Sequence, residues 1–131
     1  MPLSPVAAAV IVHAHRLLLI RRASQEGALV WQLPAGKVHR GEHSSATAVR
    51  EAREEAGVTV EATGLLGERV HPATARPMSY WACTLLAGEA HPASPREVAE
   101  VAWVDRAGLA RLVPGGLYAP VQAWVDSQLA E

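Results

Sequence analysis

The stretch "GKVHRGEHSSATAVREAREEAGV", from Gly36 to Val58, says most about the fold of this chain. It holds four glutamates and three arginines, although the 131-residue chain is half apolar and carries a net charge of only −1. From Ser44 to Ala56 there is no Gly or Pro, and Ala and Glu dominate. Ser44 or Ser45 can cap the start of a helix, and Gly57 stands where a left-handed C-terminal cap is expected. The segment therefore predicts a helix.

One face of this helix is acidic. At about 100° per residue, Glu51, Glu54 and Glu55 fall within an arc of about 100°. Carboxylates at this density repel one another unless a cation lies among them, and an all-oxygen set suits Mg²⁺ or Mn²⁺. The alternative is a solvated acidic face on which Arg50 pairs with Glu54 at i, i+4.

The loop before the helix carries the only lysine of the chain. Eleven of the twelve basic residues are Arg, and the exception is Lys37, between Gly36 and Gly41. An ammonium group next to exposed loop backbone and a predicted metal ion is the combination expected of a site that binds a diphosphate. The alternative is that Lys37 is an ordinary surface lysine.

The spacing of these residues resembles a known signature. Gly36, five residues, Glu42, seven residues and then "REAREEAGV" from Arg50 to Val58 are similar to the box of Nudix hydrolases. The preceding "WQLPAGK" is also similar to the family, so the resemblance extends over essentially the whole chain. It implies an α/β (or α+β) fold of the α/β/α sandwich type, with a mixed central sheet and a catalytic loop, helix and loop.

The resemblance also implies roles for the box residues. Glu54 and Glu55 would be the principal metal ligands, and Glu51 a further ligand or the general base. Arg50 would orient the glutamates, Glu42 would support the loop or the metal through water, and Lys37 would contact the diphosphate. The carbonyl of Ala35 or Gly36 would complete the coordination of Mg²⁺, or of Mn²⁺ in its place.

The implied reaction is hydrolysis of a nucleoside diphosphate linked to a group X. The favoured case is a nucleoside triphosphate cleaved to a monophosphate and pyrophosphate. The alternatives are an ADP-ribose or nucleotide-sugar diphosphatase and a non-catalytic nucleotide-binding module. Glu51 is the expected base, but "PREVAE" offers Glu97, which we favour over Glu100, as an acid from a later loop.

Residues outside the box are expected to bind the rest of the substrate. The candidates, beside Lys37, are Arg22, Trp31, Arg76, Tyr80, Trp81 and Tyr118, because rings stack on bases and guanidinium groups pair with base edges or phosphates. The tryptophans can equally be core residues, and Arg22 a solvated strand end. Tyr118 stands where the family's oxidised-guanine enzyme has Asn, and His39 and His43 lie near the diphosphate loop.

The remaining pattern predicts one domain over residues 1–131. The expected elements are a hairpin of Val6–His13 and Arg16–Arg22, a short strand ending at Pro34, strands at Val58–Ala62, Leu65–His71, Met78–Leu86 and Val98–Val104, and helices from Asp105 to Leu112 and from Ala119 to Leu129. Cys83 is alone and expected to be buried. Neither a membrane segment nor a signal peptide is evident, so the expected location is the cytoplasm. The near-neutral charge gives no case for a nucleic-acid polymer, and we expect a monomer or homodimer.

Overall fold

The computed structural model describes residues 3–23 and 28–130. Its elements are β1 (Val6–His13), β2 (Arg16–Ala23), β3 (Leu29–Gln32), β4 (Ala35–Lys37), α1 (Ser44–Ala56), β5 (Thr59–Val70), β6 (Pro77–Ala87), β7 (Val98–Val104), α2 (Arg106–Leu112) and α3 (Ala119–Gln128). Within this described part, no helix is long and apolar enough to cross a membrane.

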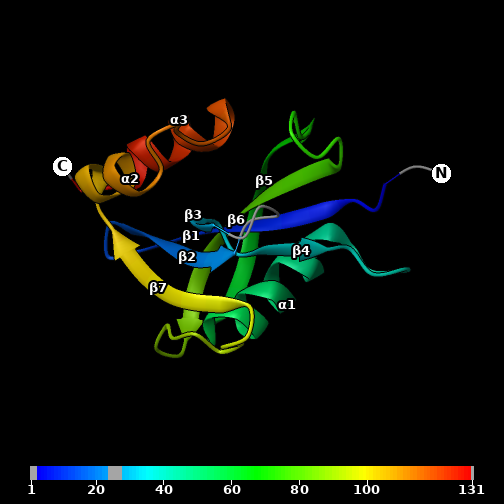
Figure 1. The fold of residues 1–131 in the computed structure, drawn as a ribbon, viewed down its shortest axis with the longest axis horizontal. Helices are drawn as coiled ribbons and strands as arrows, with labels where there is room; N and C mark the ends of the chain where they lie inside the picture. The colour runs from blue at the N-terminus through cyan, green and yellow to red at the C-terminus, as the bar shows by residue number, and fades with distance from the viewer. Residues whose placement is uncertain (1–2, 24–27, 131) are drawn as a thin grey trace.

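The strands form a mixed sheet, as the sequence predicts (Figure 1). Its main path runs β3-β2-β1-β6-β5, with β4 added to β1 and β7 added to β2. β1 and β6 are parallel, and the other pairs are antiparallel. The short strand β4 therefore lies beside the centre of the fold and leads directly to α1.

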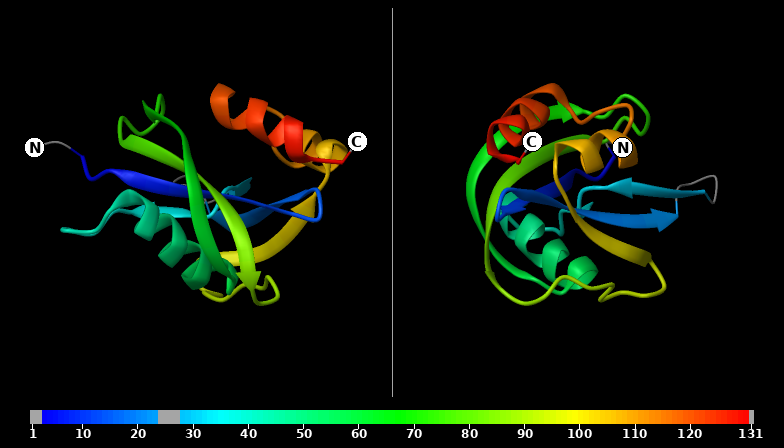
Figure 2. Two further views of the ribbon diagram at one scale, coloured as in Figure 1. Left: turned by 180° about the vertical axis from the view of Figure 1, so that it is seen from behind. Right: turned by 90° about the vertical axis from the view of Figure 1, so that its left-hand side faces the viewer.

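Alternation along β1 and β2 creates a hydrophobic core on each face of the sheet. Ala9 and Ile11 pack with the buried alanines of α1, whereas Ala8 and Val10 pack with α2 and α3. Figure 2 shows α1 on one side of the sheet and α2 and α3 on the other. The predicted α/β/α arrangement is confirmed.

Helix α1 has the predicted bounds, but its predicted N-cap is wrong. Ser44 and Ser45 are already helical, and extended His43 is the cap, with its Nδ1 accepting from the amide of Ser45 at 3.1 Å. An imidazole nitrogen can accept here as a hydroxyl would. At the other end, Gly57 has φ +69°, which confirms the predicted left-handed cap.

Two strand predictions also need correction. The two strands expected between Val58 and His71 are one strand, β5, whose pairing with β6 shifts after Thr59 and again near Gly64 and Gly67. The glycines look like strand breaks in the sequence, but here they accommodate bulges. Beyond Pro34 the chain also forms β4, which the sequence does not predict.

The predicted helix with Asp105 as its cap is confirmed. The Asp105 side chain accepts a hydrogen bond from the amide of Gly108 at 2.8 Å.

Cys83 is buried, as predicted, with an exposed fraction of 3%. Burial raises the pKa of its thiol to about 12. Because the thiolate is the reactive form, we expect iodoacetamide to leave the native protein unmodified at pH 8 and to alkylate it completely in urea. Mass spectrometry distinguishes the two states, and rapid labelling of the native protein would contradict the buried placement.

Candidate active site

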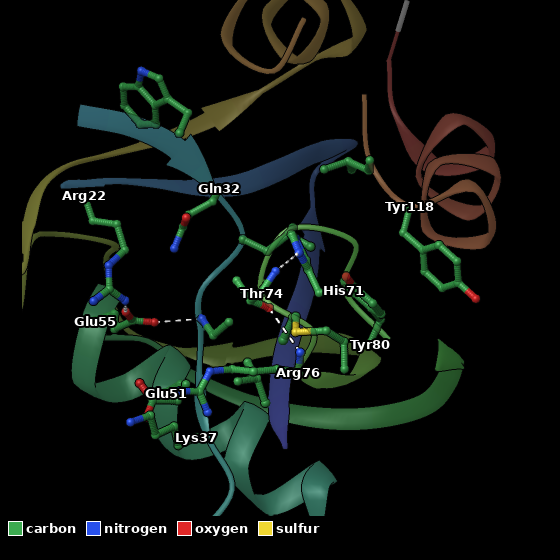
Figure 3. Close-up of a pocket in the computed structure, with 18 of the residues that line it drawn as sticks. Arg22, Gln32, Lys37, Glu51, Glu55, His71, Thr74, Arg76, Tyr80 and Tyr118 are labelled. Carbon is green, nitrogen blue, oxygen red and sulfur yellow. Dashed lines mark hydrogen bonds and ion pairs between the residues drawn. The ribbon is translucent and has the colours of Figure 1, made fainter. Parts of the chain in front are cut away.

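A cleft of about 550 Å³ opens on the face of the sheet that α3 partly covers. Strand register defines its floor, because paired residues project to the same face. One row across the sheet is Lys37, Val6, Met78 and Arg69, and the next row is Ala35, Ala8, Tyr80 and Gly67. Every residue of the first row lines the cleft. Figure 3 shows Glu51, Glu55 and Lys37 at one end and Tyr118 at the other.

Glu55 is almost completely buried at the first end. Its side chain is 1% exposed, accepting from the amide of Ala35 at 2.8 Å and from Arg22 at 2.9 Å. Burial raises the pKa of this carboxyl to about 7, and repulsion from Glu51 and Glu97 adds to the effect. The neighbouring strand and Arg22 thus hold a carboxylate where its charge is costly.

Glu51 fills the space that a side chain at Gly36 would need. A Cβ on Gly36 would lie 2.2 Å from Oε1 of Glu51, so only glycine lets the strand and this glutamate come so close. Burial raises the pKa of Glu51, although Arg50 donates to it at 2.7 Å. The first glycine of the box therefore makes room for the first glutamate of the helix.

Arg50 connects the acidic residues. Its guanidinium donates to both oxygens of Glu42 at 2.9 and 3.0 Å, to Glu51 at 2.7 Å and to Glu54 at 3.2 Å, and to the carbonyl of Lys37 at 3.0 Å. The hydrogen bonds from Arg50 hold the pKa of Glu42 far below its usual range. The alternative of a solvated acidic face predicts a contact between Arg50 and Glu54. This contact is present, but it is only one of five hydrogen bonds that Arg50 donates.

The donor set fits a hard divalent cation by its chemistry. Glu51, Glu54 and Glu55 lie on one helix beside Glu97, and burial, with a smaller contribution from like charges, raises the pKa values of Glu51 and Glu55. Over residues 3–23 and 28–130, no three His, Cys, Asp or Glu side chains already stand in the geometry of a metal site. Arg22 and Arg50 neutralise the carboxylates instead.

The structure brings the predicted substrate residues together. The cleft lining includes Arg22, Trp31, Lys37, Arg76, Tyr80 and Tyr118, together with Gly36, Glu51, Glu55 and Glu97. Arg50 and Glu54 stand outside the lining, next to it.

Some of the weaker candidates lie elsewhere. Glu100 is not part of the lining and pairs with Arg21 at 2.9 Å. Trp81 donates to the hydroxyl of Ser44 at 3.0 Å and stacks edge-on against His43. His39 and His43 do not line the cleft, and their assistance to the diphosphate loop stays a prediction.

Sequence reasoning missed Arg69. Its guanidinium carbon lies 4.7 Å from the Tyr118 ring centre and 5.7 Å from that of Tyr80, and its Nε donates to the Tyr80 hydroxyl at 3.1 Å. Tyr118 packs over Gly67, where a Cβ would come within 3.0 Å of the ring. Arg69 reaches the cleft through the register between β5 and β6, which places it opposite Met78. No local pattern in the sequence indicates this register.

Comparisons with known proteins agree on one family. The model of the NUDIX domain matches residues 2–122. A candidate mutator protein, MutT4, from Mycobacterium tuberculosis (strain CDC 1551 / Oshkosh) is 35% identical over 96 residues, which is 66% of this chain. This chain spans only 37% of the length of that relative.

Solved structures show the same fold. A NUDIX hydrolase from Nitrosomonas europaea aligns with a TM-score of 0.82 at 21% identity, covering 98% of this chain and 73% of the other. An ADP-ribose pyrophosphatase from Streptococcus suis aligns with a TM-score of 0.73 at 25% identity, covering 98% and 93%.

Proposed function

The chain belongs to the NUDIX family and is MutT-like within it, and from this premise we propose that it hydrolyses a nucleoside diphosphate linked to a second group. The observation that carries the proposal is the cleft in which Glu51 and Glu55 meet Lys37 and the tyrosines. We propose that residues 1–131 act as one catalytic unit.

Members of this family generally use divalent metal ions, and we propose Mg²⁺, with Mn²⁺ as a substitute. Glu51, Glu54, Glu55 and the carbonyl of Gly36 would hold the ion. When bound, it neutralises charge on the diphosphate and makes water more acidic. Arg50 supports this group by fixing Glu51 and Glu54 in place.

The contacts favour Glu97 over Glu51 as the group that takes a proton from the attacking water. Glu51 is tied to Arg50 at 2.7 Å and serves as a proposed ligand, which engages its oxygens. Glu97 lines the cleft, and its charge acts on both Glu51 and Glu55. Lys37, in the first floor row, would bind the diphosphate beside them.

The nucleoside would lie toward the other end. Three strand spacings of about 4.8 Å separate Lys37 from Arg69, which gives about 14 Å for a diphosphate and its nucleoside. Tyr118 and the Arg69 guanidinium offer faces on which a base can stack, and the buried Tyr80 supports both from below. Water would attack one phosphorus of the diphosphate, and the bond from that phosphorus to the bridging oxygen would break. With a nucleoside triphosphate, cleavage between the α- and β-phosphates would yield a monophosphate and pyrophosphate.

A second candidate is an ADP-ribose diphosphatase. The likeness to the Streptococcus suis ADP-ribose pyrophosphatase supports it. The products differ, because ADP-ribose would give AMP and ribose 5-phosphate. A third candidate, a binding module, would retain nucleotide without turning it over.

The test is a substrate panel with Mg²⁺ and Mn²⁺. It contains the ribo- and deoxyribonucleoside triphosphates, ADP-ribose and UDP-sugars, with both products read by ion-exchange chromatography. We expect a monophosphate and pyrophosphate from a triphosphate. A monophosphate and a sugar phosphate would select the second candidate, binding without turnover the third, and an absence of both binding and turnover would refute the proposal.

A further inference from the structure

The loop between β6 and β7 is bonded to the C-terminal end of α1. The last carbonyls of a helix have no partners within it, and here the loop supplies them. The contacts are His91 N to Ala56 O at 3.0 Å, Ala93 N to Glu55 O at 3.2 Å and Ser94 Oγ to Glu54 O at 2.6 Å. Of these three contacts, the one from Ser94 uses the side chain.

Close packing accompanies these bonds. A Cβ on Gly57 would lie 2.1 Å from the His91 ring, and a Cβ on Gly88 would lie 2.8 Å from the carbonyl oxygen of Gly57. Both glycines also have positive φ, at +69° and +97°. The loop thus approaches the helix end as closely as backbone allows.

Ser94 also bonds to the segment that carries Glu97. Its carbonyl accepts from the amides of Glu97 at 2.9 Å and Val98 at 2.8 Å. Val98, the first residue of β7, is 1% exposed. One residue therefore connects the backbone of Glu54 to the backbone of Glu97.

We propose that Ser94 is a positioning residue that holds Glu97 in register with the glutamates of α1. The proposal rests on the proposed function, in which Glu97 accepts a proton. Without the hydroxyl, the Glu54 carbonyl loses this donor, and the loop stays bonded to the helix only through the backbone amides of His91 and Ala93, both of which precede the turn from Ser94 to Glu97. A displacement of about 1 Å at a reacting group can cost up to about a hundredfold in rate.

Ser94→Ala is expected to lower kcat about tenfold and to leave KM unchanged, because Ser94 does not line the cleft. The matched control is Ser127→Ala, since the Ser127 hydroxyl also donates to a carbonyl at 2.6 Å, that of Trp124 on α3. The control should keep the wild-type kcat, and Ser94→Thr, which retains a hydroxyl, should recover most of the rate. A wild-type kcat in Ser94→Ala, or an equal loss in Ser127→Ala, would overturn the proposal.

A double-mutant cycle separates positioning from general stability. If Ser94 acts through Glu97, adding Ser94→Ala to Glu97→Gln should slow turnover no further than Glu97→Gln alone. Independent, multiplying losses would refute the coupling.

Amide hydrogen exchange supplies a readout that needs no substrate. The amides of Glu97 and Val98 should exchange faster in Ser94→Ala, whereas the Leu129 amide, bonded to Val125 on α3, should not change. Unchanged protection at Glu97 and Val98 would refute the inference even if the wild type turned over no nucleotide. Failure of the substrate panel alone would refute the proposed function instead.

Discussion

Glu54→Gln is expected to lower kcat by about 10³-fold and to weaken divalent-metal binding, while thermal unfolding stays close to that of the wild type. The side chain is 53% exposed, so the substitution costs little burial. It removes one negative charge from the proposed ligand set, and metal-based stabilisation of a transition state contributes several kcal/mol. Steady-state kinetics, calorimetric titration with Mn²⁺ and a thermal melt measure the three effects.

Glu61→Gln is the matched control for this substitution. Glu61 is an exposed glutamate on β5 with no role in the cleft. The Glu61→Gln variant should therefore keep the wild-type turnover, metal affinity and melting temperature. Wild-type turnover in Glu54→Gln would remove Glu54 from the proposed metal site.

Arg50→Met is expected to reduce both turnover and stability. The change keeps much of the side-chain length but leaves Glu42, Glu51 and Glu54 without their shared cation. Loss of a residue that orients ligands typically costs about 10–100-fold in activity. The stability loss should be about 2 kcal/mol, below the roughly 3–5 kcal/mol of fully buried pairs, because Arg50 is 22% exposed. Kinetics and urea unfolding at pH 7 measure the two losses.

The stability difference should shrink in acid. Arg50 depresses the folded-state pKa of Glu42 below its usual 4.5, so the pair stabilises the fold above pH 4.5 and this contribution is lost as pH falls toward the folded pKa. Urea unfolding at pH 7 and at pH 3 should therefore give a smaller gap between wild type and Arg50→Met at pH 3. Arg53→Met, an exposed change on the same helix, should show neither loss, and a pH-independent gap would contradict the assigned role of Arg50.

Local pattern was enough to predict α1 and its acidic face. Helical periodicity depends on residues three and four apart, and the Gly57 cap on one residue, so neither needs knowledge of the rest of the fold. The ring and basic residues proposed for the substrate also reach the cleft, with the exception of Trp81. The family resemblance, rather than periodicity, supplied the role of Arg50.

Contacts between distant segments were beyond local pattern. Arg69 faces the cleft only because β5 and β6 pair in a register shifted at two glycines. Ser94 meets Glu54 across 40 residues of sequence, and Tyr118 reaches the carbonyl of Glu68 across 50. The sequence already favours Glu97 over Glu100, but the partner of Glu100, Arg21 on the neighbouring strand β2, could be identified only from the strand pairing.

Strand β5 is the outer strand of its sheet and is twelve residues long. Leu65 and Val70 on it are 46% and 66% exposed, so a straight ladder there would offer a template for the strands of other molecules. Its pairing with β6 shifts at three places instead, and each irregularity bends and twists the strand. The irregularities near Gly64 and Gly67 therefore also make the outer edge of β5 a poorer template for strands of other molecules than a regular ladder would be.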